Sequence, residues 1–218
     1  NELPSAITVQ KGNTQDKKHF GVLFSTLEKV ADPNSLMIFD CGANTKANKE
    51  RIRKAGFHYL TLKAKKRITY NRFLHLFNHS EKQTVYIGKL KYDCVKVIEG
   101  TEVNYIFFSE KLKREQLEKR CKKFLRELNK NDVTLAKVKK GKDLNTIVSR
   151  EGYIVMQGKL QCALNKINNP YVTGLEGFFI LESSVDTEPE KILLLYKQRD
   201  KAEKLIRNMK EGTELRPM

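Results

Sequence analysis

The sequence of 218 residues contains no run of about 18 apolar residues, so it predicts no membrane-spanning helix. Its first ten residues lack the basic and then apolar pattern of a secretory signal. The four cysteines, at positions 41, 94, 121 and 162, form no CxxC pair and show no metal-ligand spacing. Together these absences predict a cytoplasmic protein with reduced thiols and no membrane partner.

Histidine is also sparse, with residues at positions 19, 58, 75 and 79. His75 and His79 are four residues apart and could share one helix face as zinc ligands. No cysteine or further histidine lies close to them in the sequence. A structural or surface role is therefore favoured for this pair.

Acidic residues are outnumbered: 26 Asp and Glu stand against 42 Lys and Arg, which gives a formal net charge of +16. Phosphate backbones are the commonest partner of such a surface, because binding them releases condensed counterions. The excess is concentrated in residues 107–150, which contain 14 Lys and Arg but only 6 Asp and Glu. Two interpretations stay open for this segment: contact with a DNA backbone, or the solvated face of an amphipathic helix.

Hydrophobic patterning predicts helices and strands that alternate in the first third of the chain. We expect a strand at 5–10, a helix from Asp16, a strand at 36–39, a helix at about 46–55 and a strand at 57–62. The strand at 36–39 is a continuous apolar run, typical of a buried strand of a parallel or mixed sheet, and it ends in Asp40. This alternation indicates an α/β fold.

The middle of the chain has a different pattern. Residues 84–108 contain three β-prone runs with short turn-like breaks, as in an antiparallel meander. A basic amphipathic helix is expected over 110–130. Further strands are expected at 153–156 and 177–181, and a last helix begins near Pro189 and continues to about residue 210.

The last predicted helix carries a polar stripe: Tyr196, Arg199, Glu203 and Lys210. Their offsets of 3, 4 and 7 residues keep them on one side of an α-helix. The spacing alone is more typical of an exposed helix face with one Arg–Glu pair.

This stripe resembles the YREK signature of the DDE-type insertion-sequence transposases. Three further blocks resemble the same family. Residues 12–16 (GNTQD) are similar to its GNxxD segment, and residues 56–60 (GFHYL) are similar to the strand after the second catalytic Asp. Residues 38–44 (IFDCGAN) resemble the strand that ends in that Asp, with Cys41 in the place usually taken by Arg.

The resemblance implies a ribonuclease-H-like fold, in which helices flank a mixed sheet and an insertion interrupts the core. We expect residues 1–83 to form the first part of this core. Residues 84–165 are expected to form the insertion, with the β meander and the basic helix. Residues 166–218 are then the last core strand and the YREK helix.

The resemblance also implies a two-metal site for Mg²⁺ or Mn²⁺, with Asp40 and Glu203 as two of its three carboxylates. Hard divalent ions prefer carboxylate oxygens, and a pair of them assists phosphodiester cleavage. Tyr196, Arg199 and Lys210 are then expected to contact transposon-end DNA. The alternative for Asp40 is a turn or cap residue after a strand.

The implied function is cut-and-paste transposition: metal-dependent cleavage and transfer of double-stranded DNA by a homodimer on paired ends, at the nucleoid. The family's first Asp lies upstream of the GNxxD block, where this chain has Glu2 as its single acid. We therefore expect the first catalytic Asp and the first strands of the sheet to be absent, and the chain to be a fragment with little activity by itself. The alternatives are a non-catalytic DNA-binding remnant and a metal-dependent nuclease of the same fold.

Overall fold

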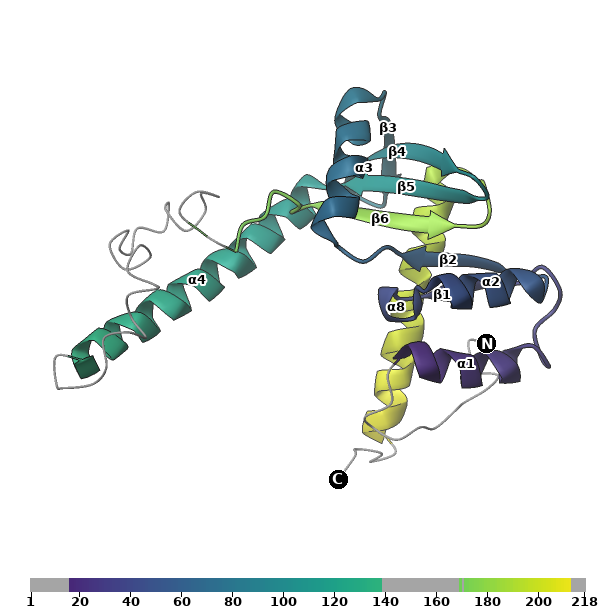
Figure 1. The fold of residues 1–218 in the computed structure, drawn as a ribbon, viewed down its shortest axis with the longest axis horizontal. Helices are drawn as coiled ribbons and strands as arrows, with labels where there is room; N and C mark the ends of the chain where they lie inside the picture. Colours follow the sequence, from purple (N-terminus) through teal and green to yellow (C-terminus); the bar gives the residue numbers. More distant parts are fainter. Residues whose placement is uncertain (1–15, 139–168, 170, 213–218) are drawn as a thin grey trace. The chain divides into compact units, whose positions relative to one another are not determined.

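The computed structural model describes residues 16–138, 169 and 171–212 (Figure 1). The strands expected at 5–10 and 153–156, and most of the block at 12–16, lie outside these residues. The chain divides into two compact units, one formed by residues 1–107 and 179–218 and the other by residues 108–178. Each unit is described by itself.

A six-stranded sheet forms the centre of the first unit, in the order β1-β2-β6-β5-β4-β3. Its strands are β1 (Leu36–Phe39), β2 (His58–Leu62), β3 (Gln83–Ile87), β4 (Leu90–Glu99), β5 (Glu102–Phe108) and β6 (Phe178–Ser183). β1 and β2 are parallel, whereas β6 is antiparallel to β2 and β4 is antiparallel to β3. The sheet is therefore mixed, as the ribonuclease-H-like fold requires.

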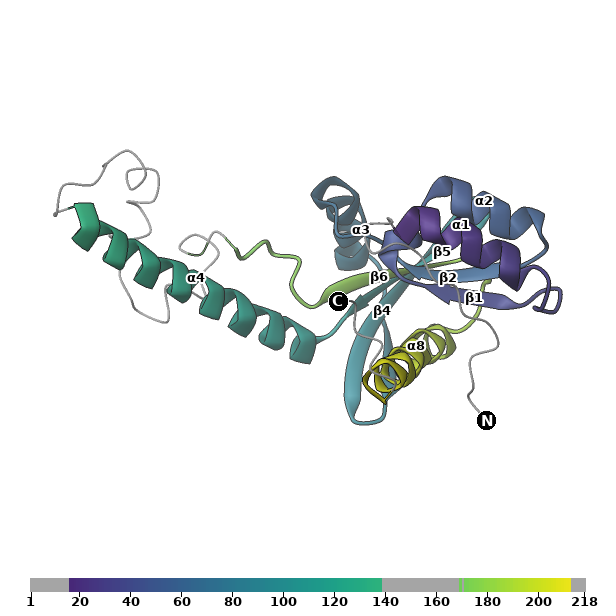
Figure 2. The same cartoon turned by 90° about the horizontal axis from the view of Figure 1, so that it is seen from below.

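Helices cover both faces of this sheet. They are α1 (Asp16–Leu27), α2 (Lys46–Lys54), α3 (Arg67–His79) and α8 (Pro189–Gly212), and the 3-10 helix η1 (Cys41–Ala43) follows β1. In Figure 2, α1, α2 and α3 lie on one side of the sheet and α8 lies on the other. The α/β class and the layered arrangement expected from the sequence are confirmed.

Two apolar cores separate these layers, because consecutive strand residues point to opposite faces of a sheet. Tyr59 of β2 packs with Phe24 of α1 and Ile52 of α2. Its neighbour Leu60 points the other way and packs with Ile192 and other residues of α8. Strand β1 is held in the same way, because Met37 and Phe39 pack against the first core and Leu36 and Ile38 against the second.

The meander β3–β5 belongs to the same sheet as β1, β2 and β6. From the sequence alone, these strands are expected to belong to an insertion that begins at residue 84. Instead, the compact unit that interrupts the sheet comprises residues 108–178. The difference arises because β6, which follows this unit in the chain, lies between β2 and β5 and joins the meander to the first strands.

The second unit is built on the helix α4 (Glu110–Val138). The segment 171–177 contacts its first half. Arg120 of α4 donates a hydrogen bond to the carbonyl of Tyr171 and pairs with Glu176 at 3.1 Å. The Gly177 amide donates to Gln116 Oε1 at 2.9 Å. These polar contacts fix which side of α4 faces inward.

Within residues 16–138 and 171–212, no helix combines the length and apolar content that crossing a bilayer requires.

Candidate functional site

Asp40 stands at the carboxyl end of β1, where the chain turns into η1. Its Oδ1 accepts a hydrogen bond of 2.6 Å from the Cys41 amide and so caps η1. Its Oδ2 lies 3.4 Å from Nη1 of Arg199 on α8, and 56% of the side chain is exposed. The cap expected as an alternative is thus present, and the second carboxylate oxygen pairs with Arg199.

The turn after Asp40 is held by side-chain hydrogen bonds to neighbouring backbone. Asn44 Nδ2 donates to the carbonyl of Leu62 on β2 at 3.2 Å. Thr45 caps α2 by accepting from the Asn48 amide, and Asn48 Nδ2 donates to the Ala43 carbonyl at 2.8 Å. Because these bonds link η1 to α2 and β2, the Asp40 carboxylate projects from a rigid strand end.

The first half of the polar stripe on α8 lies beside Asp40. The guanidinium carbon of Arg199 is 5.1 Å from the ring centre of Tyr196, and the Arg199 side chain is only 21% exposed. The structure therefore brings Asp40, Arg199 and Tyr196 together. The side chains of Glu203 and Lys210 lie outside the described part, although their backbone belongs to α8.

The position beside Asp40 suits a hard cation. Its carboxylate is the ligand type that Mg²⁺ and Mn²⁺ prefer, and in this structure it already attracts a positive charge, that of Arg199. Glu203 lies about one helical turn after Arg199 on the same polar stripe of α8. Among the side chains that the structure describes, no three His, Cys, Asp or Glu residues come close enough to hold a metal ion.

Cys41 occupies the place that an Arg usually takes in the resembling family. Burial, and after it the negative charge of Asp40, raises the pKa of the Cys41 thiol. The thiol is therefore neutral at neutral pH, and it adds no positive charge next to the carboxylate.

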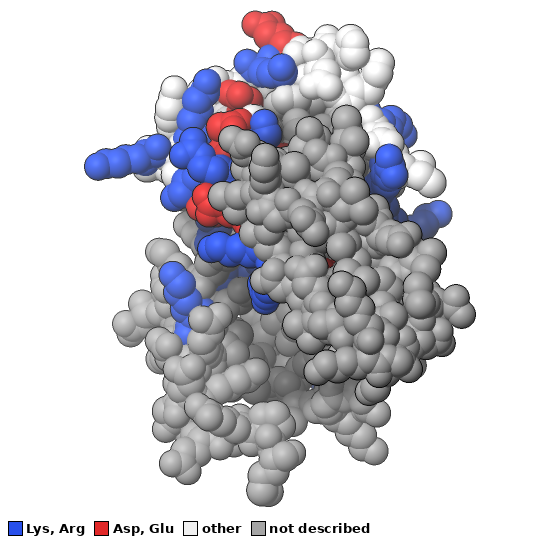
Figure 3. Space-filling model, turned by 90° about the vertical axis from the view of Figure 1, so that its left-hand side faces the viewer, with Lys and Arg blue, Asp and Glu red and all other residues white. Residues whose placement is uncertain are grey.

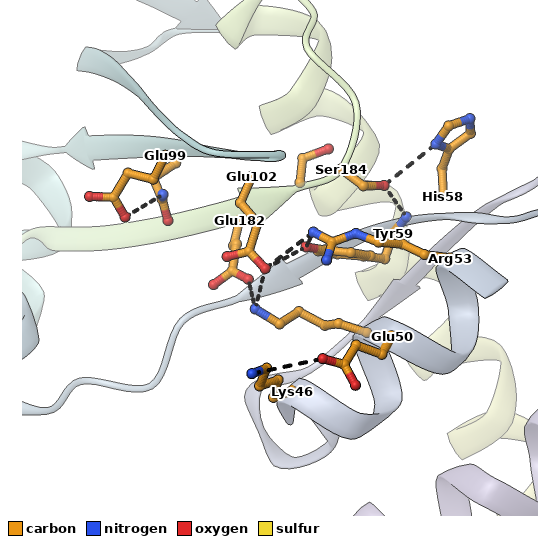
Figure 4. Close-up of polar contacts among 12 residues, drawn as sticks. Lys46, Glu50, Arg53, His58, Tyr59, Glu99, Glu102, Glu182 and Ser184 are labelled. Carbon is orange, nitrogen blue, oxygen red and sulfur yellow. Dashed lines mark hydrogen bonds and ion pairs between the residues drawn. The ribbon is translucent and has the colours of Figure 1, made fainter.

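A buried ion network on the opposite face of the sheet was not foreseen from the sequence. Glu182 of β6 is 2% exposed and binds Lys63 at 2.8 Å. Lys49 of α2 pairs with Glu182 and also with Glu102 of β5, the latter at 2.7 Å. Figure 4 shows the Glu102 and Glu182 carboxylates next to each other, with Arg53 near Glu102.

This network holds α2 against the sheet. A buried carboxylate requires cations and hydrogen bonds to offset its lost hydration. Lys49 supplies these from α2, and Lys63 supplies them from the residue directly after β2. The one available sequence signal was Glu182 at the end of the apolar strand FFILES, where an unpaired charge would be costly.

Glu102 is expected to make the stability of the fold sensitive to acid. Burial by itself raises its pKa, but the hydrogen bond and charge of Lys49 outweigh burial and lower the pKa to about 2. Because the ordinary value is 4.5, the stabilisation is complete above that pH and is lost as the pH falls toward 2. A Glu102→Gln variant should therefore lose less stability than the parent between neutral pH and pH 3, in urea unfolding experiments.

An exposed carboxylate provides the control for this experiment. Glu81→Gln removes the same charge at an exposed position before β3 and should leave the acid sensitivity of the parent unchanged. Equal loss of stability in Glu102→Gln and in the parent would contradict the predicted contribution of Glu102.

Comparison with known proteins places this arrangement in a family. A mixed sheet flanked by helices is consistent with the ribonuclease-H-like fold. The family model of the transposase DDE domain matches residues 1–216, and the chain belongs to this family. No curated protein and no solved structure matched the chain.

Family membership confirms the class of enzyme expected from the sequence. Proteins of this family are transposase-type enzymes that act on DNA and generally use divalent metal ions. The likeness of residues 196–210 to the YREK signature and the roles of the individual residues stay predictions.

Proposed function

We propose that this chain carries part of the catalytic centre of a cut-and-paste DNA transposase, with Asp40 and Glu203 as two of three carboxylates that bind Mg²⁺ or Mn²⁺. The main support is the 3.4 Å contact between Asp40 and Arg199. It joins the end of β1 to the stripe of α8, two segments that are far apart in the sequence.

The residues of the site have complementary roles in this proposal. When bound, the divalent ions supply an activated oxygen nucleophile and stabilise the leaving oxygen. Asp40 offers its oxygens from a strand end that is fixed by its neighbours, which keeps their positions constant. Arg199, Tyr196 and Lys210 hold the backbone of the transposon end, because guanidinium and ammonium groups bind phosphate well.

The substrate in this proposal is double-stranded DNA, both transposon ends and target, bound by a homodimer on paired ends at the nucleoid. Asp40 and Glu203 supply two of the three carboxylates that the resemblance implies for this site. We therefore propose that the chain by itself binds the ions weakly and has little strand-transfer activity. Efficient metal-dependent joining of transposon ends by this chain alone would contradict that expectation.

Paramagnetic broadening by Mn²⁺ tests the proposed site directly. Mn²⁺ added to the isotopically labelled chain should broaden the amide NMR signals around residues 40 and 203 in the same concentration range. Excess Mg²⁺, which is diamagnetic and competes for the same oxygens, should restore these signals. If the signals around residue 40 or those around residue 203 were not broadened, the proposal of a joint metal site would be wrong.

The high positive charge favours a second candidate, a non-catalytic DNA-binding remnant. Such a protein would bind duplex DNA but would show no common Mn²⁺ site at residues 40 and 203. A metal-dependent nuclease of the same fold would share the metal site. It would cleave DNA without joining ends, so parallel cleavage and end-joining assays separate it from a transposase.

A further inference from the structure

Four exposed cations lie on one face of α4: Lys119, Lys122, Lys123 and Arg126. Their offsets of 3, 4 and 7 residues place them along two helical turns, about 10 Å of helix. No acidic residue lies between positions 119 and 126. We call these four residues the α4 cationic face. Figure 3 shows Lys and Arg side chains in blue, with Asp and Glu in red among them, on one face of the molecule.

The orientation of this face is set by the opposite side of the helix. Cys121 and Phe124 are buried, and Arg120 binds the Tyr171 carbonyl and the Glu176 carboxylate. The apolar side of this stretch is therefore already covered by protein. A helix that binds a membrane surface needs an exposed apolar face, so a lipid bilayer does not fit this arrangement.

The α4 cationic face contains like charges three and four residues apart. Like charges at these spacings repel on a helix. Closer to the start of α4, Lys111 pairs with Glu115 at 3.9 Å and Lys113 with Glu110 at 3.7 Å. Among the described side chains, no acid forms an ion pair with any of the four cations, and Lys123 stacks 4.1 Å from the ring centre of Tyr171. A polyanion would relieve this repulsion.

We propose that the α4 cationic face binds the phosphate backbone of duplex DNA and gives the transposase a sequence-independent contact within the unit 108–178. A duplex presents one negative charge per about 1.7 Å of its axis, so a row of cations about 10 Å long meets several phosphates. The inference rests on the proposed function only for the choice of DNA as the polyanion. It decides between the two interpretations that the sequence left open for residues 107–150.

The salt dependence of DNA binding tests this contact. The parent chain and a triple variant, Lys119→Gln with Lys122→Gln and Arg126→Gln, are titrated with a fluorescent duplex over a range of salt concentrations. Each phosphate contact that is lost should make the negative slope of log K against log salt shallower by about 0.9, a change of up to about 3 for the triple variant. The loss should be similar for duplexes of unrelated sequence.

A second triple variant removes the same charge from another surface. Lys82→Gln with Lys89→Gln and Lys91→Gln changes exposed lysines around β3 and β4, where Lys91 lies 3.6 Å from Asp93. Its salt dependence should equal that of the parent. Circular dichroism should show unchanged helicity for both variants, since glutamine has a helix propensity close to those of lysine and arginine.

The inference fails if the α4 variant retains the salt slope of the parent, or if both triple variants lower it equally. It also fails if anionic phospholipid vesicles bind the α4 cationic face and duplex DNA does not. These outcomes are separable from a failure of the proposed catalytic site. Without a common Mn²⁺ site at residues 40 and 203, a decreased slope in the α4 variant would still support the DNA contact.

Discussion

Asp40→Asn is expected to weaken the binding of Mn²⁺ to this chain by about tenfold or more, because even partners of metal ligands typically contribute that much to metal affinity. The Asn side chain keeps an oxygen that can accept the hydrogen bond from the Cys41 amide, so the cap of η1 survives. The decrease in Mn²⁺ affinity is then caused by the loss of negative charge and not by a distorted strand end. Titration of Mn²⁺ by electron paramagnetic resonance gives the dissociation constants of the parent chain and of the Asp40→Asn variant.

Two further variants make this experiment specific. Asp32→Asn removes the same charge from an exposed turn before β1 and should leave Mn²⁺ affinity unchanged. Arg199→Gln removes the cation that lies 3.4 Å from Asp40 and should strengthen Mn²⁺ binding, since the ion no longer competes with a guanidinium. Equal affinities in Asp40→Asn and Asp32→Asn would exclude Asp40 as a ligand.

Gly177→Ala should destabilise the unit of residues 108–178 by about 3 kcal/mol or more. Gly177 has a φ of 82°, in the left-handed region that a Cβ disfavours. An added Cβ would also lie 2.8 Å from Lys113 Cβ, Phe108 Cε2 and the Ser109 carbonyl oxygen. The backbone cannot simply move away, because Ser109 and Gly177 are joined by a 3.0 Å hydrogen bond. Hydrogen exchange of the first turns of α4 measures the loss.

Gly88 offers the matched control for this substitution. Its φ is 59°, but an added Cβ would meet no atom within 4 Å. Gly88→Ala should therefore cost only the conformational penalty, about 1 kcal/mol. If urea unfolding and hydrogen exchange gave equal losses for the two variants, the close approach at Gly177 would have no energetic consequence.

The sequence predicted elements better than it predicted their arrangement. The apolar run of β1 and the proline at the start of α8 are local signals, and both elements lie where they were expected. The three strands of the meander were also identified. Sequence order could not show that β6 lies between β2 and β5, because strand neighbours are chosen by packing over the whole sheet.

The same contrast between local signals and long-range arrangement holds for the candidate site. Asp40 and the polar stripe of α8 were proposed from residue type, spacing and family resemblance, and the structure places Asp40 beside Arg199. The network of Lys49, Glu102 and Glu182 was missed because its members come from three distant segments with no shared spacing. Only the fold reveals that these charges are buried together.

The close ends of the segment 108–178 have a consequence for its evolution. Phe108 ends β5 and Phe178 begins β6, and the centres of their rings are 4.7 Å apart. The chain thus leaves and re-enters the sheet at nearly the same point. A segment with such ends can lengthen, shorten or change its charge while the strands keep their pairing. Related transposases could therefore exchange this module and acquire different affinities for DNA while the sheet and the strand end at Asp40 stay the same.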